Sequence, residues 1–264
     1  MHIHWESHGI ERGPAVVLVQ GLGLSSRFWF DQPQRLAKRG RVITLDNRGT
    51  GRSDKPRRPY RLPQMADDVA RVIREANAGP AIVVGISMGG MIAQHVAMRH
   101  PRDVRALVLL ATTPGHPHGT FPAPRALATL LRAPSQRRNP AALREFNRLL
   151  LPEHELDNAH IHLSRWPEAM AHDPLSMQTF VRHFLAVMTN WTGANVARIE
   201  HPAIVVHGED DILVPPRNGE TLAKLIPRAE LMMLPRVAHA VPTLVPDIIE
   251  RALERLAEHE RKVA

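Results

Sequence analysis

The segment from Gly85 to Gly89 combines residue types that can carry out nucleophilic catalysis. It reads Gly-Ile-Ser-Met-Gly, so a serine stands between two glycines, each two positions away. A short apolar run at 81–84 precedes it and a helical pattern follows it, which predicts a sharp turn between a buried strand and a helix. Such a turn strains the backbone and exposes the serine hydroxyl. We therefore predict that Ser87 is a nucleophile, the alternative being a serine that only caps the helix.

Two backbone N–H groups are expected to face the negative charge that develops when a serine attacks a carbonyl. One belongs to Met88, which follows the serine at the positive end of the expected helix. The other is expected in the loop Gln20-Gly21-Leu22-Gly23, whose glycines let the backbone approach a substrate closely. We predict that Leu22 and Met88 form an oxyanion hole, with an ordinary glycine-rich turn as the alternative for the first loop.

A carboxylate and a histidine late in the chain could complete a proton relay with this serine. Asp210 and Asp211 stand on a turn after the strand-like run at 203–207, where either carboxylate could orient a histidine. Only His239 and His259 follow these residues, and His259 belongs to a charged helical end. We predict that His239 is the general base and that Asp211 is its acidic partner, with Asp210 as the rival.

Metal and cofactor chemistry finds little support in the sequence. The chain has no cysteine, which excludes disulfides, thiolate metal sites and cysteine nucleophiles. Three histidine pairs have the spacing that places both rings on one face of a strand, but no third ligand accompanies any pair. These pairs are His2/His4, His116/His118 and His160/His162. We expect no metal and no cofactor, and we expect His207 to be buried and hydrogen-bonded rather than catalytic.

Strand-like and helix-like segments alternate along the first half of the chain. Apolar runs of this length suit strands that are buried on both faces of a parallel sheet. The strand-like runs are 15–19, 42–45, 81–84 and 106–110, and the helical patterns cover 27–39, 62–76 and 87–98. Strand–helix–strand repetition predicts an α/β fold with a doubly wound, mostly parallel sheet.

The pattern changes after residue 113. A Pro-, Gly- and His-rich stretch leads into residues 125–190, which read as helical and contain no strand signal. Strand-like runs return at 203–207 and 229–233, and a closing helix is expected over 244–260. We predict a core formed by residues 1–114 and 194–264, interrupted by a helical insert at 115–193.

The composition narrows the function class. The 264 residues carry 34 Lys and Arg against 26 Asp and Glu, a formal net charge of +8. No nucleic-acid motif accompanies this charge, and aromatic residues for base stacking make up only 4%. No apolar run reaches the roughly 20 residues of a membrane helix, and no signal peptide is evident. We expect a cytoplasmic protein that binds neither nucleic acid nor membrane, as a monomer or a homodimer.

Taken together, these motifs resemble the α/β-hydrolase superfamily. The matching segments are 20–23, 45–54, 85–90 and 207–211 together with His239. The resemblance implies a sheet of about seven or eight strands and a helical cap over the active site at 115–193. In this family the acid lies three residues after the glycine of its turn, which is Gly208 here and selects Asp211. The chain is most similar to small bacterial esterases and lactonases, such as the aclacinomycin methylesterase and 3-oxoadipate enol-lactonase groups.

The sequence also departs from the family pattern in two places. Gln20 stands where many members have histidine, and the N-terminal segment matches the family from what is usually its second strand. The expected sheet therefore lacks the family's first strand. Serine at position 87 argues against haloalkane dehalogenases and epoxide hydrolases, which use aspartate there.

The expected reaction is hydrolysis of a small, partly apolar carboxylic ester through an acyl-enzyme. Aromatic and Met residues of the insert are candidates for the substrate pocket, although each could equally belong to the core of the cap. These residues are Trp166, Phe180, Phe184, Met188 and Trp191. A lactonase, C–C hydrolase, thioesterase or amidase acting through the same residues is an alternative, as is a non-enzymatic receptor.

A further alternative is a methyl esterase whose substrate is linked to an acidic carrier protein. Its motive is an excess of arginine over residues 125–148 of the insert, where these arginines face only one acidic residue, Glu145. The arginines are Arg125, Arg132, Arg137, Arg138, Arg144 and Arg148. The competing interpretation is a solvated basic helical face.

Overall fold

A twisted sheet of seven strands forms the centre of the molecule in a computed structural model, which describes residues 1–10, 13–132 and 139–263. The spatial order is β1-β3-β2-β4-β5-β6-β7; β1 runs antiparallel to β3, and the other pairs are parallel. The strands are β1 (Trp5–His8), β2 (Val16–Val19), β3 (Val42–Leu45), β4 (Ala81–Ile86), β5 (Val104–Leu110), β6 (Ala203–Gly208) and β7 (Ala229–Leu234). The predicted fold class is confirmed.

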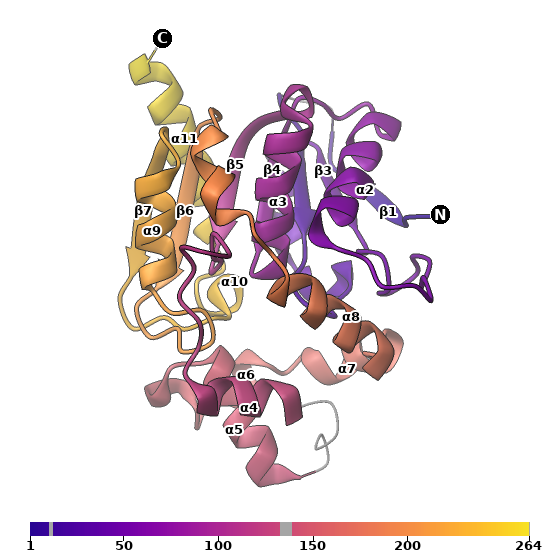
Figure 1. The fold of residues 1–264 in the computed structure, drawn as a ribbon, viewed down its shortest axis with the longest axis vertical. Coiled ribbons are helices and arrows are strands. Elements are labelled where there is room, and N and C mark those ends of the chain that lie inside the picture. The colour runs from indigo at the N-terminus through magenta and orange to yellow at the C-terminus, as the bar shows by residue number, and fades with distance from the viewer. Residues whose placement is uncertain (11–12, 133–138, 264) are drawn as a thin grey trace.

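Helices cover both faces of this sheet, each over its own apolar core (Figure 1). One face packs against α2 (Leu62–Glu75), α3 (Met88–Arg99) and α9 (Arg217–Leu225). The other packs against α1 (Gln32–Ala37) and α11 (Ile248–Val263). Because both faces are covered, β2 and β3 are buried along their whole length, as their sequences, apolar except for Thr44, predict.

The insert contributes a group of helices at one end of the core (Figure 1). They are α4 (Pro124–Arg132), α5 (Pro140–Leu150), α6 (Ala159–His162), α7 (Trp166–His172) and α8 (Met177–Met188). The two connections to the core lie side by side, since His116 N–H donates to Asn190 O at 2.9 Å and Gly193 N–H donates to His116 O at 2.9 Å. We call α4–α8 the cap helices below.

Two expected helices are interrupted. The helix expected over 27–39 is split into the 3₁₀ turn η1 (Ser26–Trp29) and α1, because Phe30 between them has a φ of 49°. The closing helix expected over 244–260 is interrupted near its start, because Pro246 disfavours a helical conformation at Val245: Leu244 ends the short helix α10 (Val241–Leu244), and α11 begins at Ile248. The remaining 3₁₀ turns are η2 (Pro101–Asp103), η3 (Glu153–Glu155) and η4 (Gly193–Arg198). No helix in the described ranges combines the length and apolar character needed to cross a bilayer.

Candidate active site

Ser87 occupies the turn between β4 and α3 and has a strained backbone, with φ 55° and ψ −120°. Glycine is required at the two flanking positions. A Cβ on Gly85 would lie 2.2 Å from Gly89 O, and a Cβ on Gly89 would lie 2.1 Å from Val19 O. The turn is also fastened to β5 and the residues after it, since Ser87 N–H donates to Leu110 O at 2.9 Å. The serine is thereby held at the carboxyl edge of the sheet.

Asp211 and His239 form a buried hydrogen-bonded pair. His239 Nδ1 lies 2.8 Å from Asp211 Oδ2, and the exposed fractions of the two residues are 6% and 2%. The other oxygen, Asp211 Oδ1, accepts hydrogen bonds from Leu213 N–H at 2.9 Å and Val214 N–H at 2.8 Å. A carboxylate at Nδ1 keeps the proton of a neutral imidazole on that nitrogen, which leaves Nε2 able to accept a proton. Asp210, the rival, is exposed.

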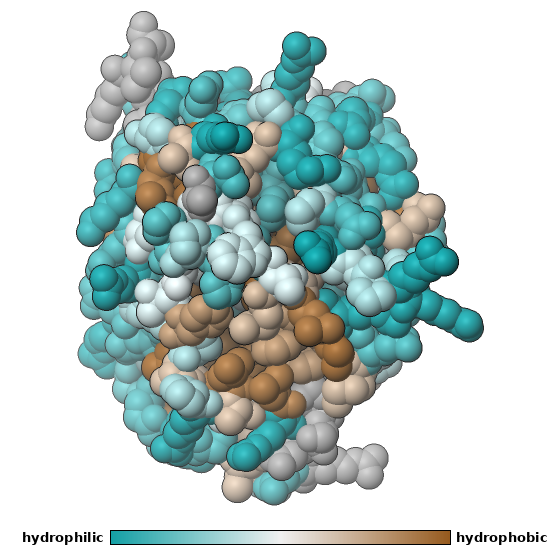
Figure 2. Space-filling view, viewed as in Figure 1, coloured by the Kyte–Doolittle hydropathy of each residue, from teal (hydrophilic) through white to brown (hydrophobic). Residues whose placement is uncertain are grey.

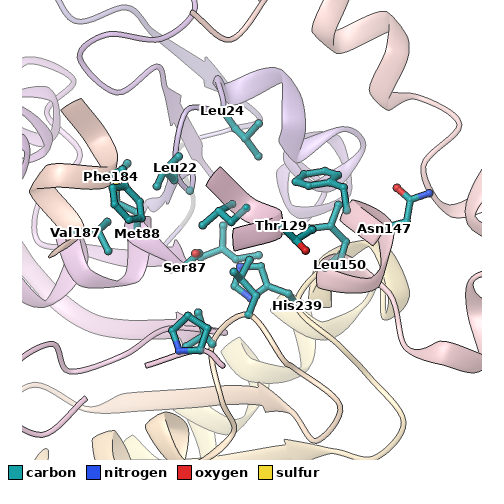
Figure 3. Close-up of a pocket in the computed structure, with 18 of the residues that line it drawn as sticks. Leu22, Leu24, Ser87, Met88, Thr129, Asn147, Leu150, Phe184, Val187 and His239 are labelled. Carbon is teal, nitrogen blue, oxygen red and sulfur yellow. The ribbon is translucent and has the colours of Figure 1, made fainter. Parts of the chain in front are cut away.

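Ser87 and His239 line the same cavity, and the view in Figure 3 shows both side chains projecting into one part of it. The Ser87 hydroxyl makes no hydrogen bond to another residue in the described part of the chain. Catalytic hydrogen bonds are often long without substrate and shorten when it binds. The hydroxyl is therefore accessible from the cavity, and the buried Asp211–His239 pair reaches the same cavity from the opposite loop.

The loop after β2 lies directly against the nucleophile. A Cβ on Gly21 would be in ordinary van der Waals contact with the Ser87 side chain, at 3.5 Å from its Cβ. Asn47 Nδ2 donates to Gln20 O at 2.9 Å, and Gln20 Oε1 accepts from Gly21 N–H at 2.8 Å. Gln20 thus orders the loop that carries Leu22. Among the described residues, no acceptor is hydrogen-bonded to the N–H of Leu22 or Met88, so both donors are unoccupied beside the serine.

The cavity has a volume of about 1160 Å³ and is lined mainly by apolar side chains. The core contributes Leu22 and Leu24 of the loop after β2 and Phe28 of η1, and the cap helices contribute further residues such as Leu127 and Leu150. Figure 2 shows apolar side chains gathered on the outer surface in the region of the cap helices. Exposed apolar residues of the cap helices are Leu131 of α4 and Val181 and Leu185 of α8. An apolar interior with an apolar surface near it suits a substrate with an apolar portion.

A family model described as alpha/beta hydrolase fold matches residues 14–242. The chain belongs to the α/β-hydrolase family. This match confirms the resemblance inferred from the sequence motifs, and it identifies the chain as a hydrolase.

Individual relatives agree with this assignment. The chain is 30% identical to a protein of Agrobacterium fabrum named "Putative carbamate hydrolase RutD", over 95% of this chain and 96% of the relative. The enol-lactonase from Burkholderia xenovorans LB400 superposes with a TM-score of 0.82 at 22% identity, over 97% of this chain and 96% of that one. A thermophilic esterase from Thermogutta terrifontis superposes with a TM-score of 0.79 at 23% identity, over 97% and 93%. The two superpositions show a shared fold.

Four of the five aromatic and Met residues expected in the pocket do line this hydrolase's cavity. They are Trp166, Phe180, Phe184 and Met188. The expectation for Trp191 is corrected, because its side chain lies outside the lining and is 68% exposed. It stacks on the ring of His116 with centroids 5.0 Å apart. The reason is its position after the end of α8, in the connection that returns to the core.

The expectation that the arginines of the cap face only Glu145 is also corrected. Other cap carboxylates besides Glu145 serve as partners because the chain between α5 and α6 folds back onto α5. The pairs are Arg125–Glu145 at 3.2 Å, Arg144–Asp157 at 3.1 Å and Arg148–Glu153 at 3.1 Å, and Arg148 also contacts Glu145. Arg132 lines the cavity, while Arg137 and Arg138 lie outside the described residues. The described arginines therefore present less free positive charge than their number suggests.

His207 is buried in β6, just before the loop that carries Asp211, as expected. Burial lowers the pKa of His207, so the ring is neutral, and its Nε2 hydrogen-bonds to Val214 O at 2.8 Å. This nitrogen also lies 3.6 Å from Asp211 Oδ2. The ring therefore supports the loop that presents Asp211. No group of three metal-binding side chains gathers in the ranges that the structure describes.

Two residues of the site were not found from the sequence. Asp46 is fully buried, and its Oδ1 accepts from both the N–H and the hydroxyl of Ser26 at 2.7 Å, which joins the loop after β3 to η1. His183 of α8 is fully buried and contacts the loop after β2. The family motif at 45–54 contains Asp46 and could have indicated it. No sequence signal distinguishes His183 from the other histidines.

Proposed function

We propose that this protein is a serine hydrolase that cleaves carboxylic esters with an apolar portion through an acyl-enzyme. One observation carries the proposal: the hydrogen-bonded Asp211–His239 pair and the strained Ser87 open into one apolar cavity. In this assignment Ser87 is the nucleophile, His239 the base and Asp211 the residue that orients it. The unoccupied N–H groups of Leu22 and Met88 form the oxyanion hole.

The proposed reaction has two halves. In the first, Ser87 Oγ forms a bond to the substrate carbonyl carbon as its proton passes to His239 Nε2, and the carbonyl oxygen takes up negative charge facing the two N–H groups. The bond to the alcohol oxygen then breaks, and that oxygen receives the proton from His239. In the second half, water attacks the acyl-enzyme with the same proton transfers, which releases the carboxylic acid and restores Ser87.

The cavity supports a substrate larger than a simple acetate. Its volume of about 1160 Å³ lies just above the range of roughly 300–1,000 Å³ for sites that enclose drug-sized ligands, and most of the cap residues that line it are apolar. Each buried methylene contributes about 0.8 kcal/mol, which corresponds to roughly a fourfold gain in binding. We therefore propose an acyl or alcohol chain of medium length.

Hydrolysis of a carbamate is the second candidate, because the Agrobacterium fabrum relative is named for that reaction. The same residues could attack a carbamate carbonyl, and the shared chemistry also covers lactones, thioesters, amides and C–C bonds. A methyl ester on an acidic carrier protein is a weaker candidate, because Arg125, Arg144 and Arg148 are each paired with a carboxylate.

The test is a panel of p-nitrophenyl esters, from acetate to dodecanoate, beside p-nitrophenyl N-alkyl carbamates of matched chain length. We expect a burst of p-nitrophenol, an acyl adduct on Ser87 by mass spectrometry, and kcat/KM that rises with acyl length before it levels off. Ser87→Ala should lower kcat/KM by at least about 10⁴-fold. Faster turnover of the carbamates would favour the second candidate. Ester turnover that survives Ser87→Ala would reject both.

Two aromatic residues offer a matched pair for the role of the cap. Phe184 lines the cavity, whereas Trp191 is exposed outside it. Phe184→Ala should lower kcat/KM for the dodecanoate about tenfold, the equivalent of one or two lost methylene contacts, and leave the acetate nearly unchanged. Trp191→Ala should change neither substrate. Equal effects of both variants on both esters would show that the acyl chain does not bind along α8.

A further inference from the structure

Helix α8 does more than line the cavity, because its His183 reaches the loop after β2. The side chain is fully buried, and its Nδ1 accepts a hydrogen bond from Gly23 N–H at 3.0 Å. Gly23 directly follows Leu22, the proposed oxyanion donor. A cap side chain is thus bonded to the backbone one residue from the reaction centre.

The second nitrogen of the ring determines which tautomer is present. His183 Nε2 lies 2.9 Å from the carbonyl oxygen of Arg48, which can only accept a hydrogen bond. Nε2 therefore carries the proton, and Nδ1 is left with the lone pair that the Gly23 N–H needs. Burial lowers the pKa of His183 to about 4, so the neutral ring persists at ordinary pH.

The glycine that His183 holds is also packed closely against the segment before α8. Gly23 has a φ of 74°, and a Cβ there would lie 2.5 Å from Leu175 Cδ1 in the segment before α8. Asp173, in the same segment, accepts from the Ser25 hydroxyl at 2.6 Å and pairs with Arg27 at 3.1 Å. The chain between α7 and α8, together with His183 of α8, therefore clamps the loop that carries Leu22.

The direction of the Leu22 N–H depends on this clamp. Gly23 N–H and Leu22 C=O belong to one peptide plane, so fixing that plane limits rotation about the Leu22 backbone. An oxyanion donor is effective only when it is aimed in advance at the position that the negative charge will take. Without the bond to His183, the Leu22 N–H would sample other directions.

We propose that His183 is a positioning residue for the oxyanion hole, which links the substrate-contacting helix α8 to the Leu22 N–H. The proposal rests on the proposed function. Phe180 and Phe184, which line the cavity, stand within one turn of His183 on the same helix. Substrate seated against these rings therefore holds the helix that holds the oxyanion loop.

Two substitutions separate the two hydrogen bonds of the ring. His183→Asn places an acceptor oxygen as many bonds from Cα as Nδ1 and removes the donor to Arg48 O. His183→Gln places an amide nitrogen as many bonds from Cα as Nε2 and removes the acceptor for Gly23 N–H. Thr179→Val is the control, because the hydroxyl of Thr179 on the same helix donates to Gly49 O at 2.8 Å, in the loop after β3, and not to the oxyanion loop.

The measurements are kcat and KM on the octanoate ester per active site titrated with a fluorophosphonate, the melting temperature, and hydrogen exchange of the Gly23 amide. We expect kcat of His183→Gln to fall about 10- to 100-fold, less than for loss of an oxyanion donor, with KM little changed. His183→Asn should retain kcat within about threefold, and Thr179→Val should lose stability but keep kcat. The Gly23 amide should exchange slowly in wild type and His183→Asn and rapidly in His183→Gln.

Several outcomes would overturn the proposal. Unchanged kcat in His183→Gln, or equal loss in both His183 variants that tracks melting temperature, would leave His183 a purely structural contact. Rapid exchange of the Gly23 amide in the wild-type protein would reject it even if neither variant folds. Absence of Ser87-dependent ester turnover in the wild type would instead reject the proposed function, and the catalytic role of His183 with it.

Discussion

At the scale of single residues, the environment of Asp211 distinguishes it from its neighbour Asp210. Asp211 is buried, accepts two backbone N–H bonds on one oxygen and bonds His239 with the other, while Asp210 is exposed. A buried carboxylate with this many donors is held in one orientation, and so is the imidazole that it contacts. The adjacent position offers a matched control of the same residue type.

We expect Asp211→Asn to lower kcat/KM on a p-nitrophenyl ester by about 10⁴-fold, because an amide at Nδ1 no longer enforces the tautomer with a free Nε2. Asp210→Asn should leave kcat/KM within about twofold. Steady-state kinetics at neutral pH, with circular dichroism to verify folding, would measure both. The assignment of the acid would be reversed if Asp210→Asn were the impaired variant.

At the scale of elements, the turn between β4 and α3 depends on its close contact with the end of β2. Gly89 packs so tightly that a Cβ would lie 2.1 Å from Val19 O, whereas a Cβ on Gly21 would meet nothing closer than 3.5 Å. The atoms nearest to a Cβ on Gly89 all belong to the backbone of Val19 and Gln20, so the turn has little room to relax. The strained φ of Ser87 is therefore maintained by the packing of the helix and two strands around it.

Gly89→Ala should destabilise the protein by about 1–3 kcal/mol or more, because overpacking at this point displaces the end of β2 or the start of α3. Gly21→Ala should change the free energy of unfolding by less than about 1 kcal/mol. Chemical denaturation of both variants would measure the difference. Equal stability of the two would contradict the close packing of the turn.

At the scale of the whole molecule, burial favours the neutral form of three histidines, of which His183 and His207 are fully buried and His95 is half-buried. Burial lowers the pKa values of His95, His183 and His207, the second to about 4. The unfolded chain binds protons near the ordinary histidine pKa of about 6.5, while the folded chain does not. The free energy of unfolding is therefore unaffected by these groups above that pH and falls as the pH drops toward 4.

We expect the melting temperature to fall as the pH is lowered from about 6.5 to about 4, with His183 alone contributing up to roughly 3 kcal/mol of the loss. His183→Asn removes that proton uptake, so its melting temperature should depend less steeply on pH in this window. Calorimetric scans of both proteins at matched ionic strength would test this. Parallel pH profiles would show that His183 is protonated in the folded state as readily as in the unfolded one.

The sequence alone determined the local features of the fold. Alternating apolar runs and helical patterns predicted the doubly wound sheet, and the glycine spacing around Ser87 predicted a turn that the structure shows to be sterically required. These signals are readable because each depends on residues close together in the chain. Local patterns did not distinguish Asp210 from Asp211 as the partner of His239, and the family resemblance was needed to select Asp211. In the structure, Asp211 is hydrogen-bonded to His239.

Only the tertiary structure decided how the cap meets the core. It showed that Trp191 lies outside the cavity, that the cap arginines have carboxylate partners, and that His183 bonds a glycine 160 positions away. The cap helices are short and amphipathic, so their sequences indicate an apolar face but not the surface that it covers. Contacts of this kind depend on where distant segments of the chain come together, and the spacing of residues within one segment does not predict which segments meet.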